Sequence, residues 1–287
     1  MRGSPSHRHQ ENSVTETMAP VPSASTSTEV PMLEARNIMK SFGSVQALTD
    51  VDFEVRAGEV MALVGDNGAG KSTLIKCLAG IYSIDEGDVF FEGKKVSIAG
   101  PKDAAKLGIE VVYQDLALCD NLDVVQNMYL GREERDIIWR LKESIMEAKT
   151  AQTLKSLSVT TIRSIRQPVA SLSGGQRQSV AIGRAVMWNS RLVILDEPTA
   201  ALGVAQTRQV LDLVKRLAGQ GLAVILISHN LHDIFEAADR ITVLRLGRNA
   251  ALLDRRAVTQ EEVVHSITAG VPTKVAGVSQ TTDEEQV

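Results

Sequence analysis

The sequence predicts an α/β protein with a mainly parallel β-sheet core, an N-terminal antiparallel β subdomain and a helical subdomain. Three observations support this fold class. In the second half of the chain, short and fully apolar segments alternate with helical ones, as in parallel sheets that are buried on both faces. Near the N-terminus, apolar and polar residues alternate around glycine turns. Between these regions, residues 122–170 are more charged and carry helically spaced apolar residues.

The first ordered elements are predicted to be extended. Residues 1–30 are rich in Ser, Thr and Pro, which predicts a disordered segment ahead of an ordered domain at residues 31–272. A turn is predicted at Gly43 and Ser44, because the segments on both sides have strand-like composition. The predicted N-terminal strands lie within residues 32–42, 50–56 and 87–96.

The middle of the chain is predicted to form the helical subdomain, at about residues 122–185. Apolar side chains recur in it at intervals of three and four residues, which is the period of one face of a helix. The spacing therefore predicts helices in this segment. The residues that carry it are Ile137, Ile138, Leu141, Ile145, Met146, Leu154 and Leu157.

The C-terminal half is predicted to alternate strand and helix. Thr259 and Glu262 fit a capping box that opens a last helix. Residues 273–287 are predicted to be a disordered acidic tail. The strands predicted for the central sheet are residues 60–64, 191–196, 222–228 and 241–246, and the helices that come after them include residues 74–78, 205–219 and 231–238.

The most specific motif lies at residues 65–73, which fit G-x-x-x-x-G-K-[ST] between a predicted strand and helix. Glycines here can adopt positive φ, so that backbone N–H groups converge on phosphate oxygens. Lys71 adds a positive charge for the β- and γ-phosphates, and the Ser72 hydroxyl is placed to bind Mg²⁺. A plain glycine-rich turn is the alternative, but the Lys-Ser-Thr sequence favours a nucleoside triphosphate site. The predicted nucleotide-binding residues are Gly65, Asp66, Asn67, Gly68, Ala69, Gly70, Lys71, Ser72 and Thr73.

A second candidate group comes after an apolar strand, where residues 192–195 run directly into Asp196 and Glu197. A carboxylate at the carboxyl end of a buried strand is typical of Mg²⁺ binding in P-loop enzymes. An ordinary acidic turn is the alternative, and the P-loop upstream favours the metal site. We expect Asp196 to hold Mg²⁺ and Glu197 to act as the general base for the attacking water.

Residues 172–176, Leu-Ser-Gly-Gly-Gln, complete an order of motifs that resembles the ATP-binding-cassette (ABC) ATPases. The resemblance covers about residues 32–270 and implies a P-loop NTPase fold of the ABC type that uses ATP and Mg²⁺. Ser173 is predicted to cap a helix from about residue 176 to residue 187. In this family such a helix end closes over ATP held by a second ATPase subunit, so a homodimer is implied. The residues predicted to contact that ATP are Ser173, Gly174, Gly175 and Gln176.

Three further residues match positions of the family. Phe42 corresponds to the aromatic residue that stacks on adenine, although a core phenylalanine is the alternative. Gln114 corresponds to the glutamine that contacts Mg²⁺ and water, and His229 to the histidine that contacts the γ-phosphate. Gly203 stands where the family usually has Asp, a departure that concerns communication between the two ATP sites. The implied catalytic residues are Lys71, Gln114, Glu197 and His229, and the implied metal ligands are Ser72, Gln114 and Asp196.

Composition argues against several classes of protein. A net charge of −4 and a pI of about 5.8, without a basic stripe, argue against a nucleic-acid partner. Cys77 and Cys119 lack the spacing of a metal site or disulfide framework and suit a reducing compartment. No apolar run approaches the roughly 18 residues needed to cross a bilayer. We therefore expect a cytoplasmic protein, unless a partner holds it at a membrane.

The resemblance extends, through residues 101–114 and 122–133, to the ATPases of monosaccharide importers of the ribose, xylose and fructose kind. It implies a peripheral subunit on the cytoplasmic face of the cell membrane that drives solute uptake through separate ABC permease subunits. An extracytoplasmic sugar-binding protein would be an indirect partner. Residues 115–145 are expected to receive a coupling helix of the permease. The alternative is a non-transport ATPase that regulates a soluble partner through ATP-dependent dimerisation.

Overall fold

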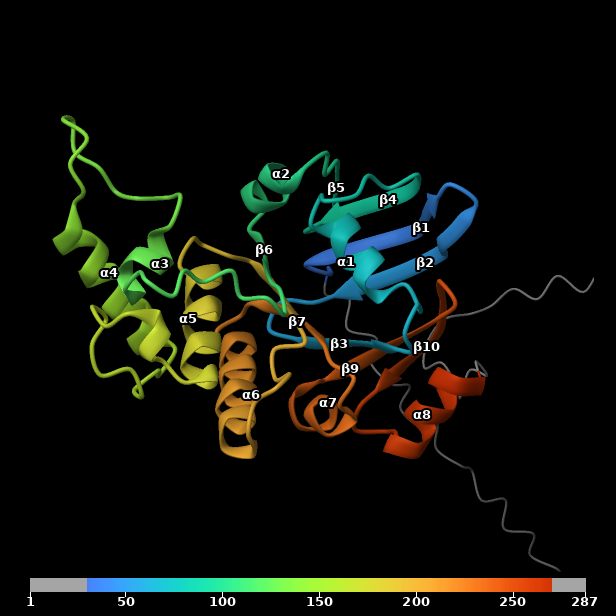
Figure 1. Ribbon diagram of the computed structural model, residues 1–287. Coiled ribbons are helices and arrows are strands. Elements are labelled where there is room, and N and C mark those ends of the chain that lie inside the picture. Colours follow the sequence, from blue (N-terminus) through green and yellow to red (C-terminus); the bar gives the residue numbers. More distant parts are fainter. Residues whose placement is uncertain (1–29, 270–287) are drawn as a thin grey trace, which may run out of the picture.

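The computed structural model describes residues 30–269, which form two β-sheets and several helices (Figure 1). The strands of the larger sheet are β3 (Val60–Gly65), β6 (Ile109–Val112), β7 (Leu192–Asp196), β8 (Ala223–Ile227), β9 (Arg240–Arg245) and β10 (Arg248–Asp254). They lie in the order β10-β9-β3-β8-β7-β6. All neighbours in this order are parallel except β10, which is antiparallel to β9. The carboxyl ends of five strands therefore share one edge.

A smaller antiparallel sheet packs against one face of the larger sheet. Its strands are β1 (Leu33–Phe42), β2 (Val45–Val55), β4 (Glu86–Phe91) and β5 (Lys94–Val96), in the order β2-β1-β4-β5. The apolar cluster between the sheets includes Val51, Leu63 and Ile194. Helix α1 (Lys71–Leu78) contributes Leu74 to the same cluster. The start of α1 is therefore fixed by packing against both sheets.

The other face of the larger sheet is covered by α5 (Gly174–Val186), α6 (Val204–Gly219), α7 (Leu231–Ala237) and α8 (Gln260–Ala269). β7 is covered on both faces, which explains why residues 192–195 are all apolar. Val193 and Leu195 join the cluster beneath these helices, whereas Leu192 and Ile194 join the cluster shared with the smaller sheet. Because side chains alternate between the faces of a strand, a strand covered on both faces has no polar side.

A helical unit lies beside the edge strand β6 (Figure 1). It consists of α3 (Val124–Tyr129), α4 (Glu143–Ser156), the short 3₁₀ helix η1 (Val169–Ser171) and part of α5. These elements have an apolar cluster of their own, because Met128, Leu154, Val169 and Val180 are buried together. The unit is thus packed around its own small core as well as against the larger sheet.

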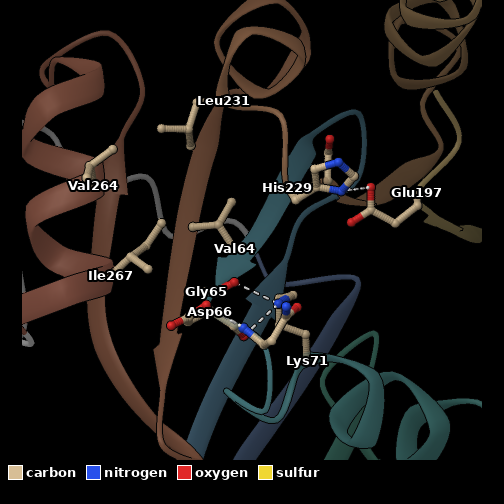
Figure 2. A pocket seen from close by; sticks show the side chains of 11 residues that line it. Val64, Gly65, Asp66, Lys71, Glu197, His229, Leu231, Val264 and Ile267 are labelled. Atoms are coloured by element: carbon tan, nitrogen blue, oxygen red, sulfur yellow. Dashed lines mark hydrogen bonds and ion pairs between the residues drawn. The ribbon is translucent and has the colours of Figure 1, made fainter. Parts of the chain in front are cut away.

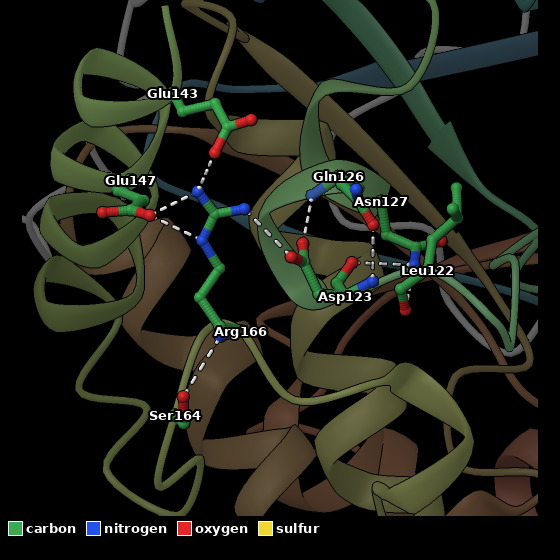
Figure 3. A network of polar contacts seen from close by, with 8 residues as sticks. All are labelled: Leu122, Asp123, Gln126, Asn127, Glu143, Glu147, Ser164 and Arg166. Atoms are coloured by element: carbon green, nitrogen blue, oxygen red, sulfur yellow. Dashed lines mark hydrogen bonds and ion pairs between the residues drawn. The ribbon is translucent and has the colours of Figure 1, made fainter.

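Arg166 ties three segments of this unit together (Figure 3). Its guanidinium donates to Asp123 at 3.1 Å, to Glu143 at 2.7 Å and to Glu147 at 2.5 Å. Asp123 also caps α3, where it accepts the backbone N–H of Gln126 at 2.7 Å. The hydrogen bonds to Asp123 and Glu147 raise the pKa of Arg166 above its ordinary value. One side chain therefore connects the loop before α5 with the beginnings of α3 and α4.

The predicted fold class is confirmed, because the larger sheet is mainly parallel and the N-terminal sheet is antiparallel. Some local predictions were incomplete. β2 begins at Val45 and not near residue 50, α5 begins at Gly174 and not near residue 176, and α2 (Pro101–Lys106) and β10 were not predicted. Residues 1–29 and 270–287, which include the predicted acidic tail, lie outside the described part. Between residues 30 and 269, no helix is both long and apolar enough to cross a bilayer.

The helical interpretation of residues 137–142 was wrong, although Ile145 does lie in α4. Ile137, Ile138, Leu141 and Ile145 are exposed, and α4 begins only at Glu143. Residues 131–142 instead form a hairpin, which we call the 131–142 hairpin. Local turn hydrogen bonds determine this segment, and Ile137, Ile138 and Trp139 at its tip are more than half exposed.

Candidate active site

Four parallel strands of the larger sheet, β3, β6, β7 and β8, have their carboxyl ends at one edge, and each has a candidate residue at or just after that end. The register pairs both Leu63 of β3 and Asp196 of β7 with Ile227 of β8. Val112 of β6 pairs with Leu195 of β7. This edge of a parallel sheet is where ligands bind in open α/β proteins. The candidate residues at these strand ends are Gly65, Gln114, Glu197 and His229.

The loop between β3 and α1 approaches the neighbouring backbone so closely that glycine is required. At Gly65, φ is 152°, and a Cβ would lie 2.2 Å from the carbonyl oxygen of Leu244. At Gly70, φ is 101°. The Nζ of Lys71 donates hydrogen bonds to the carbonyl oxygens of Gly65 at 2.7 Å and Asp66 at 3.0 Å. Burial lowers the pKa of Lys71, against the opposing effect of the nearby carboxylates. The lysine at the start of α1 is therefore folded over its own loop.

Glu197 and His229 face each other across the ends of β7 and β8 (Figure 2). The Nδ1 of His229 lies 2.7 Å from the Oε2 of Glu197, an ion pair when the imidazole is protonated. The Glu197 side chain is only 16% exposed, whereas that of His229 is 76% exposed. Glu197 also has a left-handed backbone, with φ of 52°, which is uncommon outside glycine and is found at functional sites. The histidine is accessible and the carboxylate is sheltered.

Both residues line a cavity of about 550 Å³ together with the P-loop (Figure 2). Lys71, Asp66 and Asn67 form one side of it, and Glu197 and His229 form the other. Asp196 belongs to the same strand end as Glu197, and burial and the Glu197 charge raise its pKa. The remaining wall is apolar and comes from Val64, Leu231, Val264 and Ile267.

A buried polar network, which was not predicted from the sequence, connects the segment after Glu197 with the segment after His229. Thr199 donates its hydroxyl to Asp233 at 2.6 Å, and both side chains are buried. Asn230 donates its amide to the other oxygen of Asp233 at 3.0 Å. Thr199 lies two residues after Glu197, and Asn230 comes directly after His229. The spacing of Asn230, which caps α7, and Asp233 could have indicated their hydrogen bond. Thr199 could not have been identified as the second partner, because only the tertiary fold brings its loop to Asp233.

The proposed metal ligands are oxygen donors at the same edge. Ser72 lies in the first turn of α1, Asp196 ends β7, and Gln114 lies two residues after β6. A hydroxyl, an amide and a carboxylate are the hard donors that Mg²⁺ accepts, and it usually completes its shell with phosphate and water. This donor set fits a Mg²⁺ ion that arrives with a nucleotide.

Phe42 and the Leu-Ser-Gly-Gly-Gln segment do not line this cavity. The Phe42 ring is 43% exposed and makes an edge contact with Tyr82 at 5.0 Å between centroids. Ser173 caps α5 in a box with Gln176, at 2.9 Å and 3.4 Å. Gly174 packs so closely on the segment before α6 that a Cβ would lie 2.9 Å from the side chain of Leu202. The structure therefore places the P-loop beside Glu197 and His229, and holds Ser173 elsewhere on the surface of the chain.

Arg184 of α5 attaches the loop after Gln114 to the helical unit. Its guanidinium donates to the carbonyl oxygens of Leu116 at 2.9 Å and Ala117 at 3.0 Å. The buried Asn127 of α3 holds the next part of this loop, since it bonds both the N–H and the carbonyl of Cys119, at 2.7 Å and 3.0 Å. The loop therefore has firm contacts with α3 and α5.

Arg184→Lys is expected to reduce the maximal rate of ATP hydrolysis several-fold with little change in KM. A lysine cannot bond two carbonyls with a planar fork, so the loop after Gln114 loses its support. Stability should fall by about 1–3 kcal/mol. Arg208→Lys, on the exposed face of α6, is the matched control and should change neither quantity. An unchanged rate with reduced stability would limit Arg184 to a structural role.

The sequence matches the ABC transporter family model over residues 48–200. It is 44% identical over 244 residues to the fructose import ATP-binding protein FrcA of Rhizobium meliloti, covering 83% of this chain and 94% of that protein. It is 46% identical over 238 residues to the xylose/arabinose import ATP-binding protein XylG of Sulfolobus acidocaldarius, again covering 83% and 94%. The ribose import ATP-binding protein RbsA of Yersinia pestis is 43% identical, but the match spans only 46% of its length.

Solved structures are similar over the same region. The ADP conformation of MJ1267, an ATP-binding cassette of an ABC transporter, has a TM-score of 0.71 at 27% identity, covering 83% of this chain and 94% of that one. A dimeric post-hydrolysis state of the cassette MJ0796, bound to ADP and Pi, has a TM-score of 0.66 at 25% identity, covering 79% and 100%.

Proposed function

Because this chain belongs to the ABC transporter family as an ATP-binding subunit, we propose that it energises uptake of a monosaccharide through a separate permease. The observation that carries the proposal is the match to two sugar-import ATP-binding proteins over 94% of their lengths. The protein would work as a peripheral subunit on the cytoplasmic face of the membrane. An extracytoplasmic sugar-binding protein would deliver the solute to the permease.

In the proposed reaction, the P-loop N–H groups and Lys71 bind the β- and γ-phosphates of ATP. Glu197 acts as general base toward the attacking water, and His229 stays close enough to contact the γ-phosphate. Ser72, Gln114 and Asp196 would hold Mg²⁺, which neutralises charge on the phosphates when bound. The sheltered position of Glu197 supports its role, since a carboxylate with few water contacts can direct one particular water molecule.

The second half of each ATP site is proposed to come from a second copy of the chain. The exposed residues Ser173 and Gly174 lie at the N-terminus of α5, which can bind phosphate but lies apart from the P-loop cavity of its own chain. A head-to-tail dimer would bring this helix end to the other subunit's ATP. The dimeric form of the similar cassette MJ0796 supports this arrangement.

Ser173→Arg is expected to lower ATP hydrolysis by about 100-fold or more while ATP binding to the single chain is retained. The residue is exposed and does not line the P-loop cavity, so the larger side chain blocks a site shared with a partner. Loss of the α5 cap should cost only about 1 kcal/mol of stability. Mixing Ser173→Arg with Lys71→Ala chains should restore hydrolysis above that of either variant, because one site in each mixed dimer is intact. No recovery in a mixture that still dimerises would contradict shared sites.

The transport role is tested by measuring uptake of radiolabelled fructose, xylose and ribose in cells that lack this chain. Uptake of one of these sugars should be lost on deletion and restored by the wild-type protein. Glu197→Gln, expressed at the same level, should not restore it. Normal uptake of all sugars in the deletion strain, together with ATP-dependent binding of a soluble protein, would favour the regulatory alternative instead.

A further inference from the structure

The 131–142 hairpin presents three consecutive apolar side chains to solvent at its tip. Ile137 is 98% exposed, Ile138 is 64% exposed and Trp139 is 76% exposed. Single exposed apolar residues are ordinary, but a cluster of large ones at the end of a projection indicates a binding surface. Figure 1 shows the hairpin reaching beyond α3 and α4, away from α1 and α7.

The tip is held in one conformation by its own hydrogen bonds. The carboxylate of Asp136 accepts the N–H groups of Ile138 and Arg140, both at 2.9 Å, and the Arg140 side chain at 3.1 Å. The backbone pairs Asp136 with Arg140 at 2.9 Å and Lys142 with Glu134 at 2.9 Å. Trp139 has a φ of 65°, which is unusual for a bulky residue. The apolar side chains are therefore displayed by a preformed turn, which lowers the entropy lost when the tip becomes buried.

Charge on the hairpin is arranged with positive groups outward. Its four basic residues are all exposed, whereas its three acidic residues are partly buried. Glu133 accepts the Gly131 N–H at 2.9 Å, and Asp136 closes the turn. Three of the exposed arginines also form ion pairs, Arg132 with Glu110, Arg135 with Glu133 and Arg140 with Asp136. The exposed basic residues that flank the tip are Arg132, Arg135, Arg140 and Lys142.

We propose that the 131–142 hairpin inserts Ile137, Ile138 and Trp139 into the headgroup region of an anionic bilayer and so orients the helical unit at the membrane surface. Aliphatic side chains beside an indole, flanked by Arg and Lys, match the polarity gradient of a bilayer interface. The hairpin has four basic and three acidic residues, and this small excess of exposed positive charge complements anionic headgroups. A convex tip with nearly complete exposure suits a deformable lipid surface, which needs no preformed pocket. The proposal takes from the proposed function only that the chain works beside a membrane. For residues 131–142 it replaces the expectation that this part of the chain receives a coupling helix of the permease.

The test is co-sedimentation of the purified full chain with vesicles, without ATP or permease. Wild-type protein should bind vesicles of phosphatidylglycerol and phosphatidylcholine more strongly than vesicles of phosphatidylcholine alone. Ile137→Ser/Ile138→Ser should reduce the partition coefficient at least about tenfold. Brominated lipids should quench tryptophan fluorescence in the wild type but not in Trp139→Phe, which keeps Trp188.

The matched control is Val45→Ser/Leu246→Ser, which removes two other exposed apolar side chains, 64% and 75% exposed. It should bind vesicles as the wild type does, and both double variants should keep the wild-type melting temperature. Equal binding of the tip variant and the wild type, or no binding of either, would overturn the proposal. Loss of co-purification with the permease in detergent, without any vesicle binding, would assign the tip to a protein partner instead. Because no nucleotide or sugar is present, these outcomes are independent of the transport assay.

Discussion

Glu197→Gln is expected to reduce ATP hydrolysis by about 10²–10⁴-fold while leaving ATP binding intact. The amide has nearly the same shape as the carboxylate but cannot accept the proton of an attacking water. The backbone should not move, because Glu197 donates its N–H to the Ile227 carbonyl at 3.0 Å and Thr199 remains bonded to Asp233. Phosphate release and binding of a fluorescent ATP analogue measure the two quantities separately. The variant should also accumulate as an ATP-bound dimer in size-exclusion chromatography.

Glu92→Gln is the matched control, because this carboxylate is exposed and pairs with Arg191 far from the cavity. It should hydrolyse ATP at the wild-type rate. Hydrolysis within about threefold of wild type in Glu197→Gln would mean that another group takes the proton. His229→Ala would then be the next variant to measure, since this imidazole is in direct contact with Glu197.

Gly65→Ala should lower the free energy of unfolding by about 2–4 kcal/mol and abolish ATP binding. The new methyl group would lie 2.2 Å from the carbonyl oxygen of Leu244, and a backbone atom cannot rotate away. β3 and β9 are hydrogen-bonded neighbours, with Gly65 opposite Leu244, so the strands would have to separate at the start of the P-loop. Denaturation in urea and calorimetric ATP titration measure the two effects.

Gly219→Ala provides the comparison for this substitution. Gly219 ends α6, and no atom lies within 4 Å of the position of its added Cβ. Alanine in a helix is favoured over glycine by up to about 1 kcal/mol, so the variant should be as stable as the wild type or slightly more stable. Wild-type stability of Gly65→Ala would show that the strand ends can separate at little cost.

Much of the fold and the site could be predicted because the signals are local. β8 and the first four residues of β7 are apolar, which is typical of strands covered on both faces, and a parallel sheet places the residues at their carboxyl ends along one edge. That pattern alone is enough to expect Glu197 and His229 on the same side of the sheet. The P-loop could be predicted equally well, since its glycine spacing belongs to one continuous stretch of backbone.

The features that were not predicted depend on contacts between residues distant in sequence, or lie where apolar spacing and local turn hydrogen bonds favour different structures. Asp233 resembles any first-turn acidic residue until Thr199 is placed against it. β10 has seven residues, but its apolar part is only Ala250 to Leu253 between polar ends, so its composition gave little warning. The 131–142 hairpin imitates a helix in its apolar spacing, while its actual form is determined by the turn around Asp136.

Lys71 donates hydrogen bonds to the carbonyl oxygens of Gly65 and Asp66, so these carbonyls compete with nucleotide phosphates for the lysine. An entering nucleotide must displace neutral carbonyl acceptors, and phosphate oxygens do so because charge-assisted hydrogen bonds are about twice as strong. A nucleoside monophosphate brings no β- or γ-phosphate and leaves the lysine where it is. These two hydrogen bonds are therefore expected to make the P-loop favour nucleotides with longer phosphate chains, independently of the base.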